Sequence, residues 1–136
     1  MTILLIRHTP SNAVPDASPL PARVAGHRLA CRDCDSLPAL VRCLQQHLPA
    51  DAVLTNGAGN FASWMHRFFQ HHGLVKGHKT QLAPTVGAMG YGVPAGIAAN
   101  LLTGRLAFTI AGDGDFLMNG QELATAVQHG GKSIIL

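Results

Sequence analysis

Charged residues are scarce in this chain, since only 12% of its 136 residues are Asp, Glu, Lys or Arg. The acidic residues are also unevenly spread, because no Asp or Glu occurs between Asp51 and Asp113. The formal net charge of +3 comes from basic residues scattered along the chain, without a basic helix or interleaved aromatic residues. This pattern is not typical of a nucleic-acid-binding surface, so we expect no nucleic acid partner.

Long hydrophobic runs and paired cysteines are missing as well. The opening apolar run at residues 3–6 stops at Arg7, far short of the roughly 20 residues that cross a membrane. We therefore expect no membrane segment and a cytoplasmic location. The three cysteines are an odd number without a secretory signal, so structural disulfides are not expected. Cys31 and Cys34 have the CxxC spacing of redox and zinc sites, but no second pair follows, and we interpret the spacing as chance.

The first 36 residues differ in character from the rest of the chain. They contain four prolines and show no sustained helical or strand periodicity after the first six residues. We interpret residues 1–36 as a leader or linker without an assigned fold. Residues 37–136 are then the folded part, and a chain of this length is expected to bury one sizeable core.

From residue 37 onward, helical and strand patterns alternate. Apolar residues at helical spacing predict helices over residues 37–48, 61–71, 94–102 and 119–129. Continuous apolar runs predict buried strands near residues 52–55, 106–111 and 133–136, as in parallel sheets covered on both faces. Residues 72–84 are polar and contain glycine, which predicts a loop. The alternation indicates an α/β fold with an incomplete doubly wound parallel sheet and helices on both faces.

Two of these helices carry more detailed expectations. In the helix over residues 61–71, four side chains are expected to face the core: Trp64, Met65, Phe68 and Phe69. Asn119 and Glu122 have the spacing of a helix N-cap and its reciprocal partner. An apolar stripe is expected to follow them: Leu123, Ala126 and Val127.

Three glycine-rich turns follow strands or precede helices, at residues 57–60, 87–92 and 112–114. Open α/β sheets bind ligands at the carboxyl ends of their strands. Helix N-termini there present unpaired N–H groups, so glycine backbones without side chains can cradle a diphosphate. Asp113, between two glycines, suits a magnesium ion that phosphate oxygens already hold in part, because Mg²⁺ takes few protein carboxylates. The pattern predicts a site for a metal and a diphosphate.

The runs at residues 87–95 and 111–123 resemble the C-terminal diphosphate-binding domain of thiamine-diphosphate-dependent enzymes. The acetolactate synthase and benzoylformate or pyruvate decarboxylase group is nearest, and the likeness covers about residues 37–136. The resemblance implies that Asp113 ligates magnesium. It also implies that the diphosphate is approached by the backbones of Gly112, Gly114 and Asp115.

The resemblance extends to the other two glycine turns. It implies that Gly87 offers its carbonyl to the aminopyrimidine amine and that Met89 wedges under the cofactor to keep it bent. The first turn also lines the diphosphate pocket in the family, and its matching residues are Ala58, Gly59, Asn60 and Phe61. In acetolactate synthases this turn reads Gly-x-Gly-Gln-His, so Asn60 and Phe61 stand here in place of Gln and His.

Other parts of the family pattern are missing. The second magnesium ligand belongs to an Asn-Asn pair that would lie beyond Leu136, and the last apolar run ends inside a strand. Family members also need a glutamate from a separate pyrimidine-binding domain, and no such domain fits in this chain. The resemblance therefore implies a fragment of a 2-keto acid-processing lyase or transferase that is inactive alone. Its implied partner is a second copy or a complementing pyrimidine-domain chain.

Two alternatives from different classes stay open. Gly57, Gly59 and Ala62 fit the GxGxxG/A form of a dinucleotide-binding turn, but no acid lies about 20 residues further on to bind the ribose. Lys76 and Lys79 would suit a 2′-phosphate, which leaves an NADP-binding Rossmann-like domain as one alternative. The other is a non-catalytic interaction module that uses apolar surface exposed by a half-built sheet.

Overall fold

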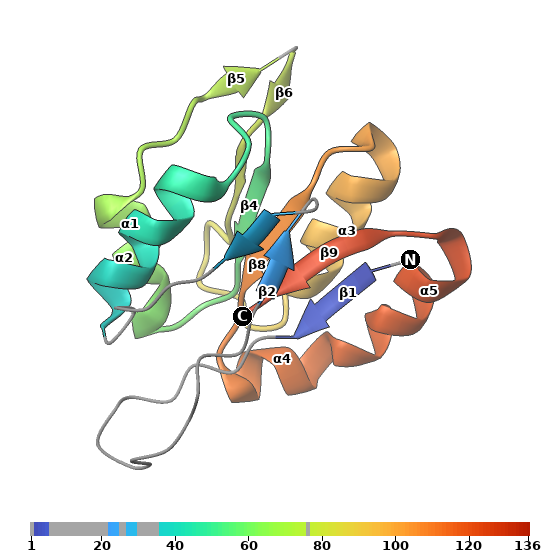
Figure 1. Cartoon of the computed structure of the whole chain (residues 1–136). Helices are drawn as coiled ribbons and strands as arrows, with labels where there is room; N and C mark the ends of the chain where they lie inside the picture. The colour runs from blue at the N-terminus through green and yellow to red at the C-terminus, as the bar shows by residue number, and fades with distance from the viewer. Residues whose placement is uncertain (1, 6–21, 25–26, 30–35, 76) are drawn as a thin grey trace, which may run out of the picture.

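The computed structural model describes residues 2–5, 22–24, 27–29, 36–75 and 77–136. Among them, five strands form a central sheet in the order β1-β9-β8-β4-β7 (Figure 1). These strands are β1 (Thr2–Leu5), β4 (Val53–Asn56), β7 (Gln81–Leu82), β8 (Ala107–Ile110) and β9 (Lys132–Ile135). Every neighbouring pair in this sheet is parallel, which confirms the predicted fold class.

Helices cover both faces of the sheet, again as predicted. They are α1 (Leu37–His47), α2 (Asn60–Phe68), α3 (Gly92–Thr103), α4 (Asp113–Asn119) and α5 (Leu123–His129), with a 3₁₀ turn η1 (Gly120–Glu122) between the last two. Figure 1 shows α1 and α2 on one side of the sheet and α3 and α5 on the other. Ser36 caps α1, because its hydroxyl accepts the N–H of Ala39.

The register of the central strands explains the two-sided core. Leu54, Phe108 and Ile134 lie side by side in β4, β8 and β9. They pack with the buried side chains of α1 and α2, among them Val41 and Met65. Since successive side chains in a strand point to opposite faces, the next row faces the other layer.

That second row is Thr55, Thr109 and Ile135, and it lies against α3. The hydroxyls of Thr55 and Thr109 are 2.7 Å apart, and Thr55 also donates to the carbonyl of Gly92. A Cβ on Gly96 would lie 2.5 Å from the Thr109 hydroxyl oxygen. The glycine therefore lets α3 approach the sheet closely.

Two segments contain more strand than expected. The predicted loop at residues 72–84 contains a hairpin of β5 (Leu74–Val75) and β6 (His78–Lys79), followed by β7 at the sheet edge. The loop prediction is wrong because β8 pairs with only one edge of β4, and Gln81 and Leu82 pair with the other edge. In the first 36 residues, β1 pairs with β9, while β2 (Ala22–Val24) and β3 (His27–Leu29) form an antiparallel pair. The boundary at residue 36 stays a prediction, and Cys31 and Cys34 lie outside the described residues.

The prediction for residues 119–129 is wrong in its start. A helix already begins at Asp113, and Asn119 is the last residue of α4 and makes no side-chain cap. Its amide instead donates to the carbonyl of Gly90, while Glu122 accepts from Thr125. A long-range contact of Asn119 and a local contact of Glu122 thus take the place of the expected reciprocal cap.

Two of the expected core side chains are on the surface. Phe68 is 46% exposed and stacks on Trp64, and Val127 is 53% exposed. Met65, Phe69 and Ala126 are buried as predicted. The structure also ends α2 at Phe68, and the buried residues of this helix are Ala62 and Met65.

Candidate functional site

The three glycine turns meet at the carboxyl ends of β4 and β8. A Cβ on Gly92 would lie 2.7 Å from the amide nitrogen of Gly57, so the first and second turns touch. A Cβ on Gly114 would lie 3.6 Å from the terminal methyl group of Met89, which joins the second turn to the third. Segments far apart in the sequence therefore form one site, at the edge where parallel sheets bind ligands.

The Phe61 ring contacts both the first turn, at Gly59, and the third turn, at Gly112. A Cβ on Gly59 would lie 2.5 Å from its ring, and a Cβ on Gly112 would lie 3.1 Å away. The ring is partly buried against the core cluster of α1 and α2. A side chain at residue 59 would therefore collide with Phe61, and a side chain at residue 112 would press on the ring, in the absence of any ligand. Neighbouring Asn60 is exposed as the first residue of α2.

Asp113 is the first residue of α4 and is exposed at the carboxyl end of β8. A negative charge in the first turn of a helix is favoured by the helix dipole. The described residues contain no group of three or more His, Cys, Asp or Glu side chains arranged to hold a metal. One carboxylate on an exposed turn is the donor set that Mg²⁺ accepts when phosphate oxygens complete its coordination.

Open surface lies next to Gly87 and Met89 in the loop before α3, and next to Gly114 of α4. Gly87 has a φ of +68°, and a Cβ placed on it would meet no atom within 4 Å. Met89 is 45% exposed although it is apolar. Gly114 is also exposed, and within 4 Å a Cβ on it would meet only Met89. The faces of Gly87, Met89 and Gly114 are therefore accessible to a ligand.

A pocket of about 540 Å³ adjoins the first turn. It is lined by Ala58, Gly59 and Gly87, and by Ser63, His66 and Arg67 of α2, among others. Its lining brings together three of the sequence-predicted residues, but it does not include Asp113 or Met89.

Sequence reasoning missed the contribution of α2 to this pocket. His66 donates to the side-chain oxygen of Asn56 at 2.9 Å, and the Asn56 amide donates to the carbonyl of Gly57 at 2.7 Å. Ser63, His66 and Arg67 are spaced three and four residues apart, which places them on one helix face. That spacing was the available signal.

Asp115 is the most buried ionisable side chain near the site, at 2% exposure. One of its oxygens accepts the N–H of Gly90 at 2.6 Å, and the other is buried without a partner. A Cβ on Gly57 would overlap the carboxylate. The sequence indicated a role for the backbone of Asp115 but gave no sign of this side-chain placement.

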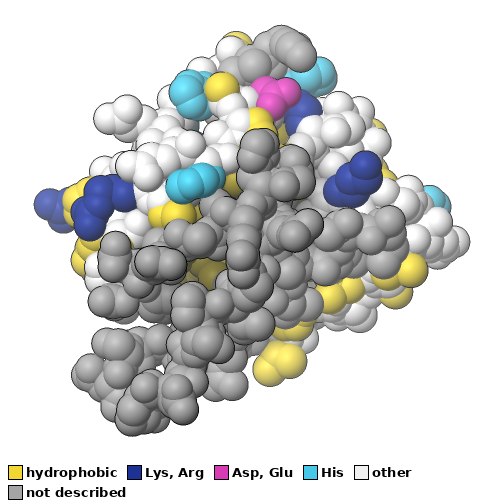
Figure 2. All heavy atoms as spheres, viewed as in Figure 1, with side chains coloured by type: hydrophobic (Ala, Val, Ile, Leu, Met, Phe, Trp, Pro, Cys, Tyr) yellow, Lys and Arg dark blue, Asp and Glu magenta, His cyan; other side chains and the backbone are white. Residues whose placement is uncertain are grey.

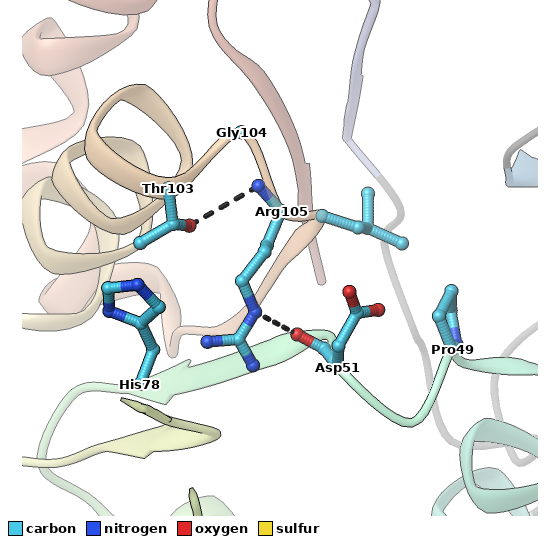
Figure 3. A pocket seen from close by; sticks show the side chains of 7 residues that line it. Pro49, Asp51, His78, Thr103, Gly104 and Arg105 are labelled. Atoms are coloured by element: carbon cyan, nitrogen blue, oxygen red, sulfur yellow. Dashed lines mark hydrogen bonds between the residues drawn. The ribbon is translucent and has the colours of Figure 1, made fainter. Parts of the chain in front are cut away.

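A second pocket, of about 410 Å³, lies at the opposite end of the strands. Figure 3 shows the Arg105 side chain between His78 and Asp51, with its Nε donating to the Asp51 carbonyl. Nη1 of Arg105 also donates to the carbonyl of Lys79 at 3.2 Å. The guanidinium thus joins the segment before β4 to β6, and its Nη2 is buried without a partner. The contacts indicate a structural role for Arg105.

Fold and site together define a parallel α/β domain that presents glycine turns and the exposed Asp113 at the carboxyl edge of its sheet. Comparison with known proteins gives the family. Residues 57–136 match the model of the thiamine pyrophosphate enzyme C-terminal TPP binding domain, thiamine pyrophosphate being another name for thiamine diphosphate. The chain belongs to this family, which confirms the resemblance drawn from the motifs.

Several curated relatives support this membership. Acetolactate synthase 2 of Brassica napus is 34% identical over 86 residues, covering 62% of this chain and 13% of the relative. The large subunit of acetolactate synthase isozyme 2 of Escherichia coli is 34% identical over 89 residues, which cover 65% of this chain and 16% of the relative. The probable 2-ketoarginine decarboxylase of Pseudomonas aeruginosa is 36% identical over 118 residues, which cover 82% of this chain and 20% of the relative. The aligned part thus spans at most 20% of these three relatives.

The membership favours thiamine diphosphate over the NADP alternative. Of the two lysines proposed for a 2′-phosphate, Lys79 is exposed in β6 and Lys76 lies outside the described residues. In the part of the chain that the structure describes, no helix is both long and apolar enough to span a lipid bilayer.

Proposed function

We propose that this chain binds thiamine diphosphate together with a magnesium ion, as the diphosphate-binding part of an acetolactate synthase-like enzyme that processes 2-keto acids. The observation that carries the proposal is the meeting of three glycine turns, with Asp113 exposed between the two glycines of the third turn and Met89 against Gly114. Family membership supports the choice of cofactor.

The residues present fit this cofactor. Asp113 would hold the metal ion, and the backbones of Gly112, Gly114 and Asp115 would hold the diphosphate with the turn at residues 58–61. The carbonyl of Gly87 would accept a hydrogen bond from the aminopyrimidine amine, and Met89 would support the rings from below. When bound, thiamine diphosphate supplies the carbon nucleophile and the electron sink for breaking a bond next to a 2-keto acid carbonyl.

The chain does not supply the acid that activates this cofactor in the family. Glu122 is the only glutamate of the sequence, and its carboxylate accepts from Thr125 at the start of α5. The activating glutamate must therefore come from elsewhere, either from another polypeptide or from another part of a longer protein. We expect this chain alone to bind the cofactor without turning over a 2-keto acid.

Exposed apolar side chains beside the site support a covering partner domain. Val86 is 88% exposed and Leu117 is 77% exposed, and Met118 lies next to Gly90. Figure 2 shows hydrophobic side chains exposed over α4 and α5. Exposed apolar surface of this kind commonly marks a protein interface. The partner we propose is a pyrimidine-binding domain, supplied by a second copy or by a complementing chain.

Calorimetric titration of the chain with thiamine diphosphate, with and without Mg²⁺, tests the cofactor assignment. We expect saturable binding that requires Mg²⁺, and a loss of affinity of roughly tenfold or more in Asp113→Ala, because a metal ligand is removed. Gln128→Ala, an exposed change on α5, is the matched control. Binding of NADP, or binding of thiamine diphosphate that depends on neither Mg²⁺ nor Asp113, would contradict the proposal.

Activity assays test the second part. The chain alone is expected to show no release of CO₂ from pyruvate and no formation of acetolactate. Addition of a pyrimidine-binding domain from a family member should produce activity if that domain supplies the missing glutamate. Turnover by the chain alone would refute the proposed dependence on a partner.

A further inference from the structure

We propose that Asp115 is a positioning residue, whose side chain clamps the three glycine turns together before any cofactor binds. The inference rests on the proposed function of the site. It concerns the carboxylate of Asp115, whereas the family resemblance concerns only the backbone at this position. Its basis is a set of contacts between α4, the loop before α3 and the turn after β4.

The first set of contacts holds Gly90. Asp115 accepts the N–H of Gly90 at 2.6 Å, and Asn119 donates to the carbonyl of the same residue at 2.8 Å. Asp115 and Asn119 are four residues apart in α4, so they project from the same face of the helix. Both backbone polar groups of Gly90 are therefore held by one helix face. A carboxylate acceptor makes the N–H bond a charge-assisted one, which is the stronger kind.

This clamp acts on the residues that are expected to contact the cofactor. Met89 precedes Gly90 directly, and its methyl group lies against Gly114 of α4. The φ of +83° at Gly90 is accessible to glycine, and a Cβ there would lie 2.6 Å from the Asn119 amide nitrogen. By fixing Gly90, α4 sets the position of Met89 relative to Asp113 at its own N-terminus.

The second set of contacts reaches the first turn. The carboxylate of Asp115 occupies the space that a side chain at residue 57 would take. The amide of Gly57 in turn donates to the carbonyl of Ile110 at the end of β8. Asp115 thus lies between the turn after β4 and the loop before α3, and contacts both.

The placement argues against Asp115 as a second metal ligand. Asp113 and Asp115 are two residues apart in α4, and such residues do not face each other on a helix. Asp113 is exposed, whereas Asp115 is 2% exposed and directed toward Gly57 and Gly90. The role that remains is to hold the loops.

Hydrogen exchange at the Gly90 amide in the 136-residue chain tests the clamp without any cofactor. Asp115→Ala should speed exchange at this amide by roughly tenfold or more, because a buried charge-assisted hydrogen bond is lost. Asp115→Asn retains the accepting oxygen and nearly the same volume, so it should restore slow exchange. Gln128→Ala, which lies on α5, should leave exchange unchanged.

The same variants, titrated with thiamine diphosphate and Mg²⁺, test the positioning role. Asp115→Ala should weaken binding by roughly tenfold, since the loops must then be ordered by the ligand, and Asp115→Asn should bind close to the original chain. Unchanged Gly90 exchange in Asp115→Ala would refute the clamp. Faster exchange with unchanged cofactor affinity would refute the positioning role.

Failure of the proposed function and failure of the clamp give different results. If the unaltered chain fails to bind thiamine diphosphate, the proposed function fails, while the exchange measurement still decides whether the clamp exists. If Asp115→Ala does not fold, Asn119→Ala removes the contact to the Gly90 carbonyl and a long, exposed contact from Gln121, and it is expected to give smaller changes in the same direction. No change in either measurement for Asn119→Ala would then count against the clamp.

Discussion

Replacement of Gly57 by alanine should be far more harmful while Asp115 is present than after Asp115 has been removed. The added Cβ would overlap both carboxylate oxygens of Asp115, so one of the two residues must move. Overpacking a close-packed site costs about 1–3 kcal/mol. Displacing the carboxylate also removes its hydrogen bond to Gly90, and hydrogen bonds to charged groups contribute about 1.5–3 kcal/mol. We expect Gly57→Ala to lower the free energy of unfolding by roughly 2–5 kcal/mol.

In the Asp115→Ala background the same substitution should cost much less. The overlapping atoms are gone, and the φ of Gly57 is not in the positive range that alanine avoids. All three of the atoms nearest to the added Cβ belong to Asp115, so we expect the remaining cost to be below about 1 kcal/mol. The difference between the two backgrounds is the coupling free energy, expected from these two costs at roughly 1–5 kcal/mol, as for residues in direct contact.

Urea unfolding of the four proteins of this cycle gives the measurement. Trp64 is the only tryptophan of the chain and packs against the core, so its fluorescence reports on global unfolding. Ala98→Gly, an exposed change in α3, serves as a control for a glycine–alanine exchange away from the site and should show no coupling to Asp115. Equal costs of Gly57→Ala in both backgrounds, within about 0.5 kcal/mol, would show that the two residues are not in contact.

Three other predictions concern parts of the fold away from the glycine turns. Arg105→Ala should lower the free energy of unfolding by about 2–4 kcal/mol, because two carbonyls lose their donor, while calorimetry should find the affinity for thiamine diphosphate unchanged. Gly96→Ala should cost about 1–3 kcal/mol in urea unfolding, because its Cβ would press on the Thr109 hydroxyl, and an unchanged stability would contradict the close approach of α3. Burial, and next the neighbouring histidines, lower the pKa of His71, so the unfolded chain binds more protons than the folded one below about pH 6.5. His71 should therefore contribute to stability above that pH and lose this contribution as the pH falls toward its folded pKa, and unfolding curves of His71→Phe should show a weaker loss on acidification. An equal acid sensitivity of this variant would show that another group is responsible.

Much of the fold was predictable because its signals are local. The strands β4, β8 and β9 are continuous apolar runs, and such runs indicate strands buried on both faces. β7 escaped prediction because two residues carry no periodicity, and this strand forms where it can pair with β4. The start of α4 was missed for a related reason. A Gly-Asp-Gly sequence has low helix propensity, and contacts of Asp115 and Asn119 with Gly90 overcome it.

The candidate site divides in the same way. The glycine turns and Asp113 were found from the sequence, since their backbone freedom and charge are properties of the residues themselves. The contribution of His66 and the pocket beside α2 appeared only when the chain was folded, because the partner of His66 is on β4. The exposure of Phe68 was missed because helical spacing indicates a face of a helix but not the width of the sheet it packs against.

The amino-acid sequence by itself determined the α/β class and the family, and it led to the proposal that Asp113 binds a metal, because apolar runs, glycines and a carboxylate act through their own chemistry. Only the tertiary structure decided that Asp115 turns inward and fills the space beside Gly57. Its hydrogen-bond partner, Gly90, is 25 residues away along the chain, and packing alone brings the two together. A buried charge is stable where the folded backbone provides a donor, and local sequence does not specify that position.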